Sequence, residues 1–193
     1  MNNLDEEIFF HSGKLINIRE TRESDALIWY KWFNNPEINK RLIYGMKPNT
    51  IEEQIKFRNH HISGQNGKII FSITEKENNK LIGTCSLNQI GPEPYKRCEI
   101  SIVLGDKRYH SGPIYLEATL WQIQHAFLNL NMNSIVAGTE EENKVVIFTL
   151  ERIGFKKVGI LRQTAFKNGK YTNYVLYDLL ISEWKNSSDY SSE

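Results

Sequence analysis

The stretch from Ile114 to Leu130 would be apolar around almost its whole circumference if wound as a helix. A helix without a polar side has to be covered by other elements, because it has no face to present to water. The segment before it, Ser111-Gly112-Pro113, is typical of a helix start, since serine can cap the first turn and proline is tolerated there. We therefore expect a buried central helix lying across a sheet.

Short runs with the two-residue alternation of half-buried strands occur on both sides of this helix. The segment 21–24 offers capping hydroxyls, on Thr21 and Ser24, and predicts the start of an early helix that ends near Asn34. Thr50 with Glu53 predicts a capping box. The order of elements predicts a mixed α/β domain, α+β-like, with one largely antiparallel sheet flanked by helices. The expected strands are 15–19, 68–75, 80–89, 97–104, 134–138, 155–163 and 171–181, and further helices are expected near 50–62 and 140–152.

A chain of 193 residues fits one domain, which we place at 15–184, with an N-terminal extension (1–14) and a flexible C-terminal tail (185–193). The 24 Lys and Arg residues against 23 Asp and Glu leave a net charge of +1, which gives no global field for nucleic acid or an anionic membrane. No leader pattern and no membrane-length apolar stretch is present. We expect a cytoplasmic monomer or homodimer with no nucleic-acid or membrane partner.

Cysteine and histidine do not form a metal-binding pattern. Cys85 and Cys98 lie in apolar strand runs and are predicted to be reduced and buried. The adjacent His60 and His61 are expected to diverge on a helix. We therefore predict no metal site.

The C-terminal part has a more specific pattern: Asn143-x-x-Val146-x-x-x-Leu150-Glu151-Arg152-x-Gly154-Phe155-Lys156, then Gly159-x-Leu161-Arg162 and Asn168-Gly169-x-Tyr171. Together with residues 29–36, 98–104 and 116–118, it resembles the GNAT N-acetyltransferase superfamily, and most of all its ribosomal-protein N-terminal acetyltransferase branch. The resemblance spans residues 15–184. It implies transfer of an acetyl group from acetyl-CoA to a primary amine.

The resemblance also implies where acetyl-CoA would bind. Strand residues Ile102, Val103 and Leu104 would hold the pantetheine arm, and the turn before the central helix would hold the pyrophosphate. This turn departs from the family pattern, because the family has Gln or Arg, Gly and a small residue at the positions of His110, Pro113 and Tyr115. Main-chain N–H groups remain at Ser111, Gly112, Ile114 and Tyr115, and the helix start still favours an anion, so we expect the cofactor to bind.

Two polar residues are candidates for the chemistry. Glu99 lies at the family's carboxylate position and would act as a base through a water; the alternative is a strand carboxylate paired with Lys or Arg. Asn143 would hydrogen-bond the pantetheine or a bound water, or else cap a helix. Leu150 stands where many relatives place a tyrosine acid, and Tyr109 or His110 could replace it.

The acceptor is left open by the sequence. Trp29, Trp32 and Tyr44 are predicted to line its site, although helical spacing also suits the two tryptophans for the core. A protein N-terminus predicts an open acidic groove, and a small amine such as an amino sugar nucleotide predicts a closed pocket with basic or aromatic walls. The alternative function is a non-catalytic binding module that kept the fold and lost the coenzyme site, as suggested by Pro113 and Tyr115.

Overall fold

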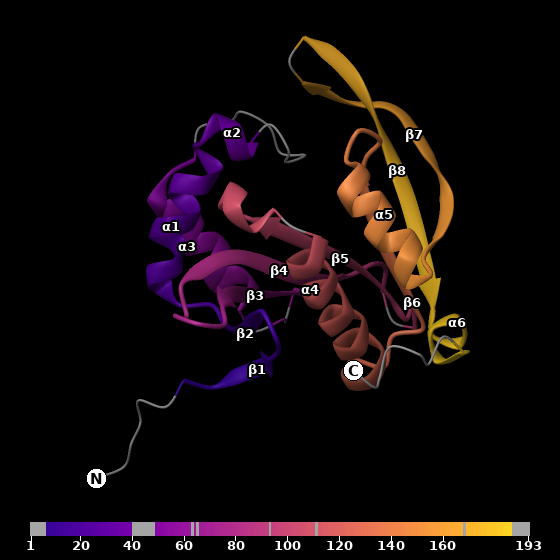
Figure 1. The fold of residues 1–193 in the computed structure, drawn as a ribbon, viewed down its shortest axis with the longest axis horizontal. Coiled ribbons are helices and arrows are strands. Elements are labelled where there is room, and N and C mark those ends of the chain that lie inside the picture. Colours follow the sequence, from indigo (N-terminus) through magenta and orange to yellow (C-terminus); the bar gives the residue numbers. More distant parts are fainter. Residues whose placement is uncertain are drawn as a thin grey trace.

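One twisted eight-stranded sheet organises the fold (Figure 1). The computed structural model describes residues 7–39, 49–62, 64, 66–92, 94–110, 112–167 and 169–186. Within them the strand order is β1-β2-β3-β4-β5-β6-β8-β7. The strands are β1 (Phe9–Ser12), β2 (Ile16–Glu20), β3 (Lys68–Glu75), β4 (Leu81–Gln89), β5 (Arg97–Leu104), β6 (Ser134–Glu140), β7 (Lys156–Lys167) and β8 (Lys170–Leu180).

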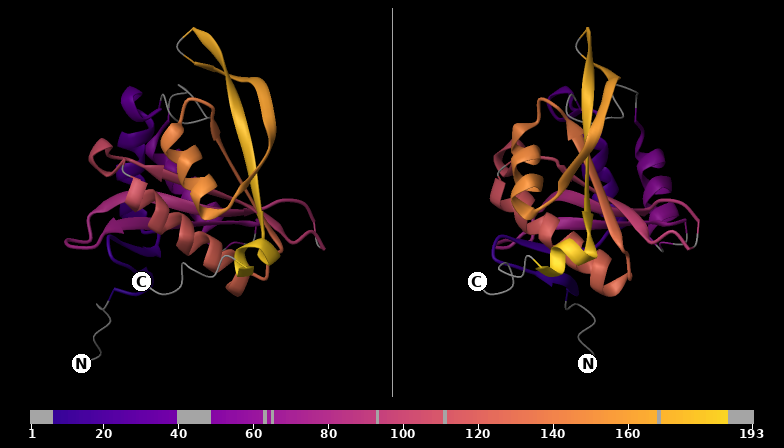
Figure 2. Two further views of the ribbon diagram at one scale, coloured as in Figure 1. Left: turned by 45° about the vertical axis from the view of Figure 1, so that its right-hand side comes forward. Right: turned by 90° about the vertical axis from the view of Figure 1, so that its right-hand side faces the viewer.

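Helices cover both faces of this sheet, as the views in Figure 2 show. α1 and α3 pack together on one face, while α4 packs on β4 and β5 from the other and α5 packs beside α4. The helices are α1 (Glu23–Phe33), α2 (Pro36–Asn39), α3 (Ile51–His61), α4 (Gly112–Gln124), α5 (Lys144–Ile153) and α6 (Ile181–Asn186), with a 3₁₀ turn η1 (Lys107–Tyr109) and a π-helical turn η2 (His125–Asn129). None of these helices is long and apolar enough to span a membrane.

All strand pairs are antiparallel except β5 with β6. This parallel pair is short, because it joins only Arg97–Glu99 to Ser134–Val136. The seam between β5 and β6 therefore divides the sheet into β1–β5 and β6–β8. The predicted class, a mixed α/β domain with a largely antiparallel sheet, is confirmed.

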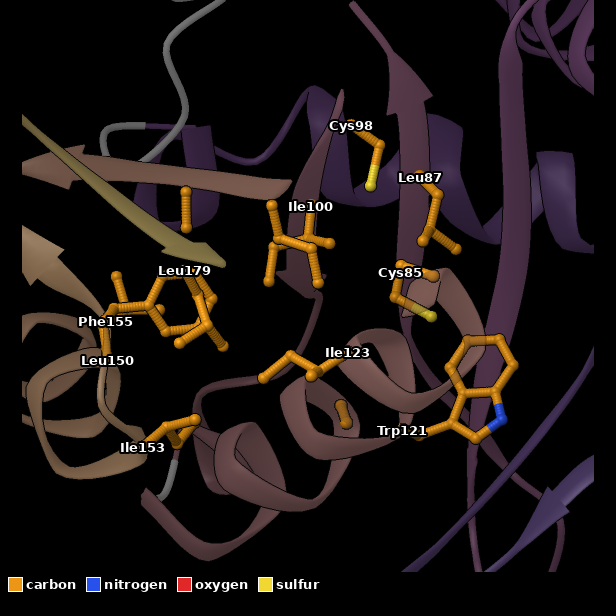
Figure 3. Close-up of a cluster of buried hydrophobic side chains, with 14 of the residues drawn as sticks. Cys85, Leu87, Cys98, Ile100, Trp121, Ile123, Leu150, Ile153, Phe155 and Leu179 are labelled. Carbon is orange, nitrogen blue, oxygen red and sulfur yellow. The ribbon is translucent and has the colours of Figure 1, made fainter. Parts of the chain in front are cut away.

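The core lies between the sheet and α4, which is buried as predicted (Figure 3). Trp121 and Ile123 of α4 point toward the strands that carry Cys85 and Ile100. Both cysteines are free and buried, and burial raises the pKa of the Cys98 thiol to about 12. The prediction that they serve as small buried hydrophobes is confirmed.

A buried ionic cluster fixes α1 to the sheet. The Asp25 carboxylate accepts two hydrogen bonds from the Arg19 guanidinium, at 2.8 and 2.9 Å, and one from the Ser72 hydroxyl at 2.7 Å. It also accepts from the Arg22 amide at 2.8 Å. A carboxylate therefore satisfies the helix start, and the prediction of a hydroxyl cap from residues 21–24 was wrong.

Other predicted boundaries have mixed outcomes. The strand bounds 68–75 and 97–104 are confirmed, and the capping box at Thr50 is present, with the Glu53 amide donating to the threonine hydroxyl at 3.1 Å. The segment 140–143 was predicted as helix, but it ends β6 and then turns, so α5 begins at Lys144. The strands β7 and β8 form a longer hairpin than expected, and β1, α2 and α6 were not predicted.

The pair His60 and His61 was also predicted wrongly. Their rings do not diverge: the centroids lie 4.7 Å apart in an edge-to-face contact, and the ring of His61 also meets that of Phe57 at 4.8 Å. Aromatic rings at the end of α3 attract one another in this geometry. The three rings form a small cluster at the C-terminal end of α3.

Candidate active site

A cavity of about 540 Å³ opens where β5 and β6 stop pairing. The last pair is Glu99 with Val136, and the next residues of each strand, 100–103 of β5 and 137–140 of β6, line the cavity. Beyond this point the facing edges of the two strands have no ladder between them. An extended molecule placed there can take up main-chain hydrogen bonds as an additional strand does.

The floor of the cavity is the polar face of β3, β4 and β5. Residues on adjacent strands lie in rows: Lys68 faces Asn88, which faces Glu99, and in the next row Ser86 faces Ser101. The two serine hydroxyls are 2.7 Å apart and hydrogen-bonded. The side chains of one such face point the same way, so these polar groups converge on the cavity.

The walls come from the helices on that face. Trp29 and Phe33 of α1 and Gln54 and Phe57 of α3 line the cavity, as does Asn49, which precedes α3. Gln54 Nε2 donates to Asn49 Oδ1 at 2.9 Å, which leaves Gln54 Oε1 buried without a partner. The Trp29 indole N–H is also buried without a partner. Unpaired polar atoms at a cavity wall are costly, and they indicate where a ligand or water can complete the structure.

Two opposite charges stand in the same row of the floor. Lys68 is partly buried, and its ammonium lies over the Phe57 ring at 5.4 Å from the ring centroid. It also interacts electrostatically with the Glu99 carboxylate. Burial lowers the pKa of Lys68, and Glu99 acts in the opposite direction. Within the described residues Lys68 forms no ion pair at 4 Å or less.

The far end of the cavity holds two tyrosines and Asn143. Tyr115 from the first turn of α4 and Tyr174 from β8 both line it, and burial raises the pKa of Tyr115. A Cβ atom on Gly138 of β6 would lie 2.3 Å from the Tyr174 ring, so glycine is needed for this packing. Asn143 Nδ2 donates to the Thr139 hydroxyl at 3.1 Å and makes no cap bond to α5.

The structure brings several sequence-predicted residues together at this cavity. They are Glu99, Ile102, Val103, Tyr115, Asn143 and Trp29. Others do not line it: Leu104 packs partly buried against the core, as does Ile114, and Gly112 begins α4. Trp32 is buried under Gly105, where an added Cβ would lie 1.9 Å from its ring. Ser111 and Tyr44 fall outside the described residues.

The two residues suggested as a replacement acid are held elsewhere. The Tyr109 hydroxyl donates to Glu75 Oε2 at 3.0 Å, and His110 Nε2 donates to the Leu104 carbonyl oxygen at 2.8 Å. The His110 contact ties the turn before α4 to the end of β5. Leu150, at the family's tyrosine position, is fully buried in the core and offers no proton.

Sequence reasoning missed the polar floor. Lys68, Ser86 and Asn88 were read only as strand residues, although β4 carries polar side chains at every second position, Thr84, Ser86 and Asn88, between buried apolar ones. A strand covered on both faces would be apolar throughout. The alternation therefore contained a signal for a polar cavity on one face. No group of three or more His, Cys, Asp or Glu arranged for a metal ion occurs among the described residues.

The comparison with known proteins decides the family. The model for the acetyltransferase (GNAT) domain matches residues 16–156. The chain belongs to the GNAT acetyltransferase family. A curated relative, the uncharacterized N-acetyltransferase p20 of Bacillus licheniformis, is 30% identical over 174 residues, which cover 88% of this chain and 94% of the relative. The predicted family resemblance is confirmed.

Solved structures show the same GNAT fold. Spermidine N-acetyltransferase from Vibrio cholerae, in complex with CoA and spermine, has a TM-score of 0.78 at 22% identity and covers 89% of this chain and 98% of its own. Ribosomal-protein-S5-alanine acetyltransferase from Vibrio fischeri has a TM-score of 0.74 at 22% identity, covering 93% and 99%. At these identities the likeness concerns the fold. In this GNAT member the seam between β5 and β6 and its cavity are the candidate active site.

Proposed function

We propose that the protein, at this cavity, transfers the acetyl group of acetyl-CoA to the nitrogen of a small primary amine. The chain is an N-acetyltransferase by family, and the proposal concerns its donor, its acceptor and the residues that act. The observation that carries it is the gap in the sheet beyond Glu99 and Val136, which opens directly onto a polar floor and aromatic walls. Donor and acceptor can therefore meet in one place.

The donor would enter through the seam. Main-chain groups of Ile102 and Val103 would bind the pantetheine arm as a neighbouring strand would, with Asn143 near its far end. The free N–H groups of the first turn of α4, at Gly112, Ile114 and Tyr115, would receive the diphosphate. Pro113 supplies no N–H, so this turn offers fewer donors than a glycine-rich one.

The reaction needs a neutral amine and a leaving thiolate. Glu99 would take the proton of the acceptor ammonium through a water, after which the nitrogen attacks the thioester carbonyl carbon. The carbon–nitrogen bond forms, the carbon–sulfur bond breaks, and CoA leaves as a thiolate. The second proton on the nitrogen is then lost to that thiolate or to water, which gives the neutral amide. A thiol of pKa about 8.5 can leave in this form near neutral pH, so the absence of an acid at Leu150 is compatible with turnover.

The walls favour a small acceptor over a protein N-terminus. A protein acceptor predicts an open acidic groove. This cavity does carry three carboxylates, Glu53, Glu99 and Glu140, but aromatic side chains from α1 and α3 and one lysine stand among them. Its volume also lies within the range of small-molecule sites, roughly 300–1,000 Å³. A panel of amines in a thiol-release assay tests this proposal, with CoA release expected for some small amines and less for peptides with free N-termini.

Binding of acetyl-CoA tests the rival function, a non-catalytic module. At a hundredfold excess over its Kd the donor should stabilise the protein by about 2.7 kcal/mol. For a chain of this size that is a rise in Tm of roughly 5–10 °C. A Tm unchanged at millimolar acetyl-CoA, together with no CoA release from any amine, would favour the module and remove the proposed transferase.

A further inference from the structure

The charge arrangement on the cavity floor points to a particular kind of acceptor. Lys68 is the one cationic side chain among the described residues that line the cavity. A lysine is an unusual wall for a site that has to receive an amine, because like charges repel. Its presence is explained if the acceptor carries a second group, of opposite charge to the lysine.

Among the residues that the structure describes, no carboxylate contacts the Lys68 ammonium at ion-pair distance. Its ammonium lies over the Phe57 ring, and the aliphatic stem is partly buried at the first position of β3. Burial lowers the pKa of Lys68, and within the described residues no carboxylate compensates its charge at ion-pair distance. A bound anion would supply that compensation through a charge-assisted hydrogen bond.

The neighbouring carboxylates do not fill this role. Glu53 is engaged at the start of α3, where its side chain accepts from the Thr50 amide at 3.3 Å. Glu140, on β6, has a partner of its own. Glu99 interacts electrostatically with Lys68, yet the two side chains do not come within ion-pair distance.

The spacing of the two charges fits one bifunctional molecule. Lys68 and Glu99 face the same residue, Asn88, from opposite sides, so two inter-strand steps place their Cα atoms roughly 10 Å apart. Their side chains rise from the same face of the sheet into the cavity. An amine near Glu99 and an anion near Lys68 would be separated by a few bonds.

We infer that the acceptor is a small primary amine that also carries an anionic group, a carboxylate or a phosphate, and that Lys68 binds this group while Glu99 faces the amine. The inference rests on the proposed function and names its substrate class. Lys68 would thus orient the acceptor so that its nitrogen points toward the thioester.

Matched acceptors test the inference on the unmodified protein. The pairs are glycine and glycinamide, 4-aminobutanoate and 4-aminobutanamide, and O-phosphoethanolamine and ethanolamine, with kcat/KM measured by CoA release. Amines within a pair are compared at a pH that gives equal fractions of free base. At least one anionic member should exceed its neutral partner by about tenfold or more, as expected for one charge-assisted contact. The carboxylate and phosphate pairs show which anion is used.

Variants then assign the effect to Lys68. Lys68→Met should remove the preference by lowering kcat/KM for the anionic member about tenfold, with less than threefold change for the neutral one, and Lys68→Arg should restore most of it. The control is Lys56→Met, because Lys56 is exposed on α3 and does not line the cavity. Circular dichroism and Tm confirm that each variant is folded.

The outcomes separate this inference from the proposed function. CoA release from amines with no preference for any anionic member would overturn the substrate class and leave the transferase standing. An equal loss for charged and neutral acceptors in Lys68→Met would also overturn it, since Lys68 would then act on Glu99 alone. No CoA release from any amine, with no stabilisation by acetyl-CoA, would instead overturn the proposed function.

Discussion

At the scale of single residues, Glu99 has the most informative position. It is the last residue of β5 that pairs with β6 and a lining residue of the cavity. Its side chain stands on the polar face, two strands away from Lys68. A carboxylate there lies beside any amine that binds in the cavity.

Replacing Glu99 tests its role as the base. Glu99→Gln should lower kcat/KM about a hundredfold at pH 7, the lower end of what a general base contributes. The loss should shrink at pH 9, because more of the acceptor amine is then already neutral. A pH series of kcat/KM for the variant and the wild type measures this, with Glu77→Gln in the exposed β3–β4 turn as the control. A loss of constant size from pH 7 to 9 would remove Glu99 as the base.

Asn143 can now be separated from a capping role. It occupies the N-cap position of α5, but its side chain bonds to Thr139 in the cavity instead of the helix amides. Asn143→Ala should therefore raise the KM for acetyl-CoA severalfold while lowering stability by less than the ~1 kcal/mol of a lost cap. Initial rates against donor concentration and urea unfolding measure the two effects. If the variant loses the whole ~1 kcal/mol of a helix cap and its KM for acetyl-CoA is unchanged, Asn143 acts as a cap of α5 instead.

At the scale of elements, the cluster of Arg19, Asp25 and Ser72 joins β2, α1 and β3. It holds α1 in the register that places Trp29 in the cavity wall. Removing one partner of a buried pair leaves the other charge uncompensated, which costs more than the pair contributes. The cluster therefore supports the wall of the cavity that Trp29 forms.

Asp25→Asn should lower the free energy of unfolding by about 3 kcal/mol at pH 7, the lower end of the cost of breaking a buried ion pair, because Glu7 at 3.0 Å from Arg19 Nε remains as a second carboxylate beside the guanidinium. Urea unfolding measures the change. The control is Glu142→Gln, which breaks the ion pair between the exposed side chains of Glu142 and Lys170 and should cost far less. Equal costs at the two sites would contradict the buried-pair argument.

The same cluster predicts an acid dependence. Burial acts to raise the pKa of Asp25, but hydrogen bonds from Arg19, the Arg22 amide and Ser72 outweigh it and hold the pKa below its ordinary value. The unfolded chain therefore binds the proton first, so this stabilisation is complete well above pH 4 and is lost as the pH falls. The difference in unfolding free energy between wild type and Asp25→Asn should shrink from pH 7 to pH 3.5. If the difference in unfolding free energy grows as the pH falls, the pKa of Asp25 is not lowered in the folded protein.

The elements show which parts of the structure the sequence could predict. Strand β3 is a short run rich in apolar residues between clear turns, β5 alternates over most of its length, and α4 is apolar around almost its whole circumference, so local pattern was sufficient. Strand β1 was missed because its four residues have no pattern of their own and pair only with β2. The end of β6 was missed because Thr139 and Glu140 pair with β8, a partner 35 or so residues away in sequence.

The site was predictable to a different extent. The family resemblance indicated Glu99, Asn143 and the residues that follow Glu99 in the same strand, and the structure brings Glu99, Asn143, Ile102 and Val103 to one cavity. Lys68 and Gln54 could not be identified as lining residues, because their place depends on how β3 and α3 pack rather than on any local spacing. Trp32 illustrates the reverse case, since its helical spacing suited both a wall and the core, and packing put it under Gly105.

At the scale of the whole molecule, two sheet segments meet at a three-residue seam. A donor bound between β5 and β6 would contact both, so its binding free energy would also hold them together. The hairpin of β7 and β8 extends beyond the remainder of the sheet on the C-terminal side of that seam (Figure 1).

Hydrogen exchange should locate the donor. Saturating acetyl-CoA should slow exchange at residues 101–104 of β5 and 137–140 of β6, because their open edges become hydrogen-bonded or covered. Peptides from β2, which is paired on both sides, serve as the internal reference. Protection confined to regions away from the seam would contradict donor binding there.

The shortness of the parallel ladder has a consequence for how such a protein can be stabilised. Each additional hydrogen-bonded pair between β5 and β6 would make the sheet more resistant to heat. It would also occupy backbone groups that the proposed acetyl-CoA donor would otherwise use. Substitutions that strengthen this junction should therefore give sturdier and slower enzymes, whereas those behind α4 can add rigidity without loss of rate.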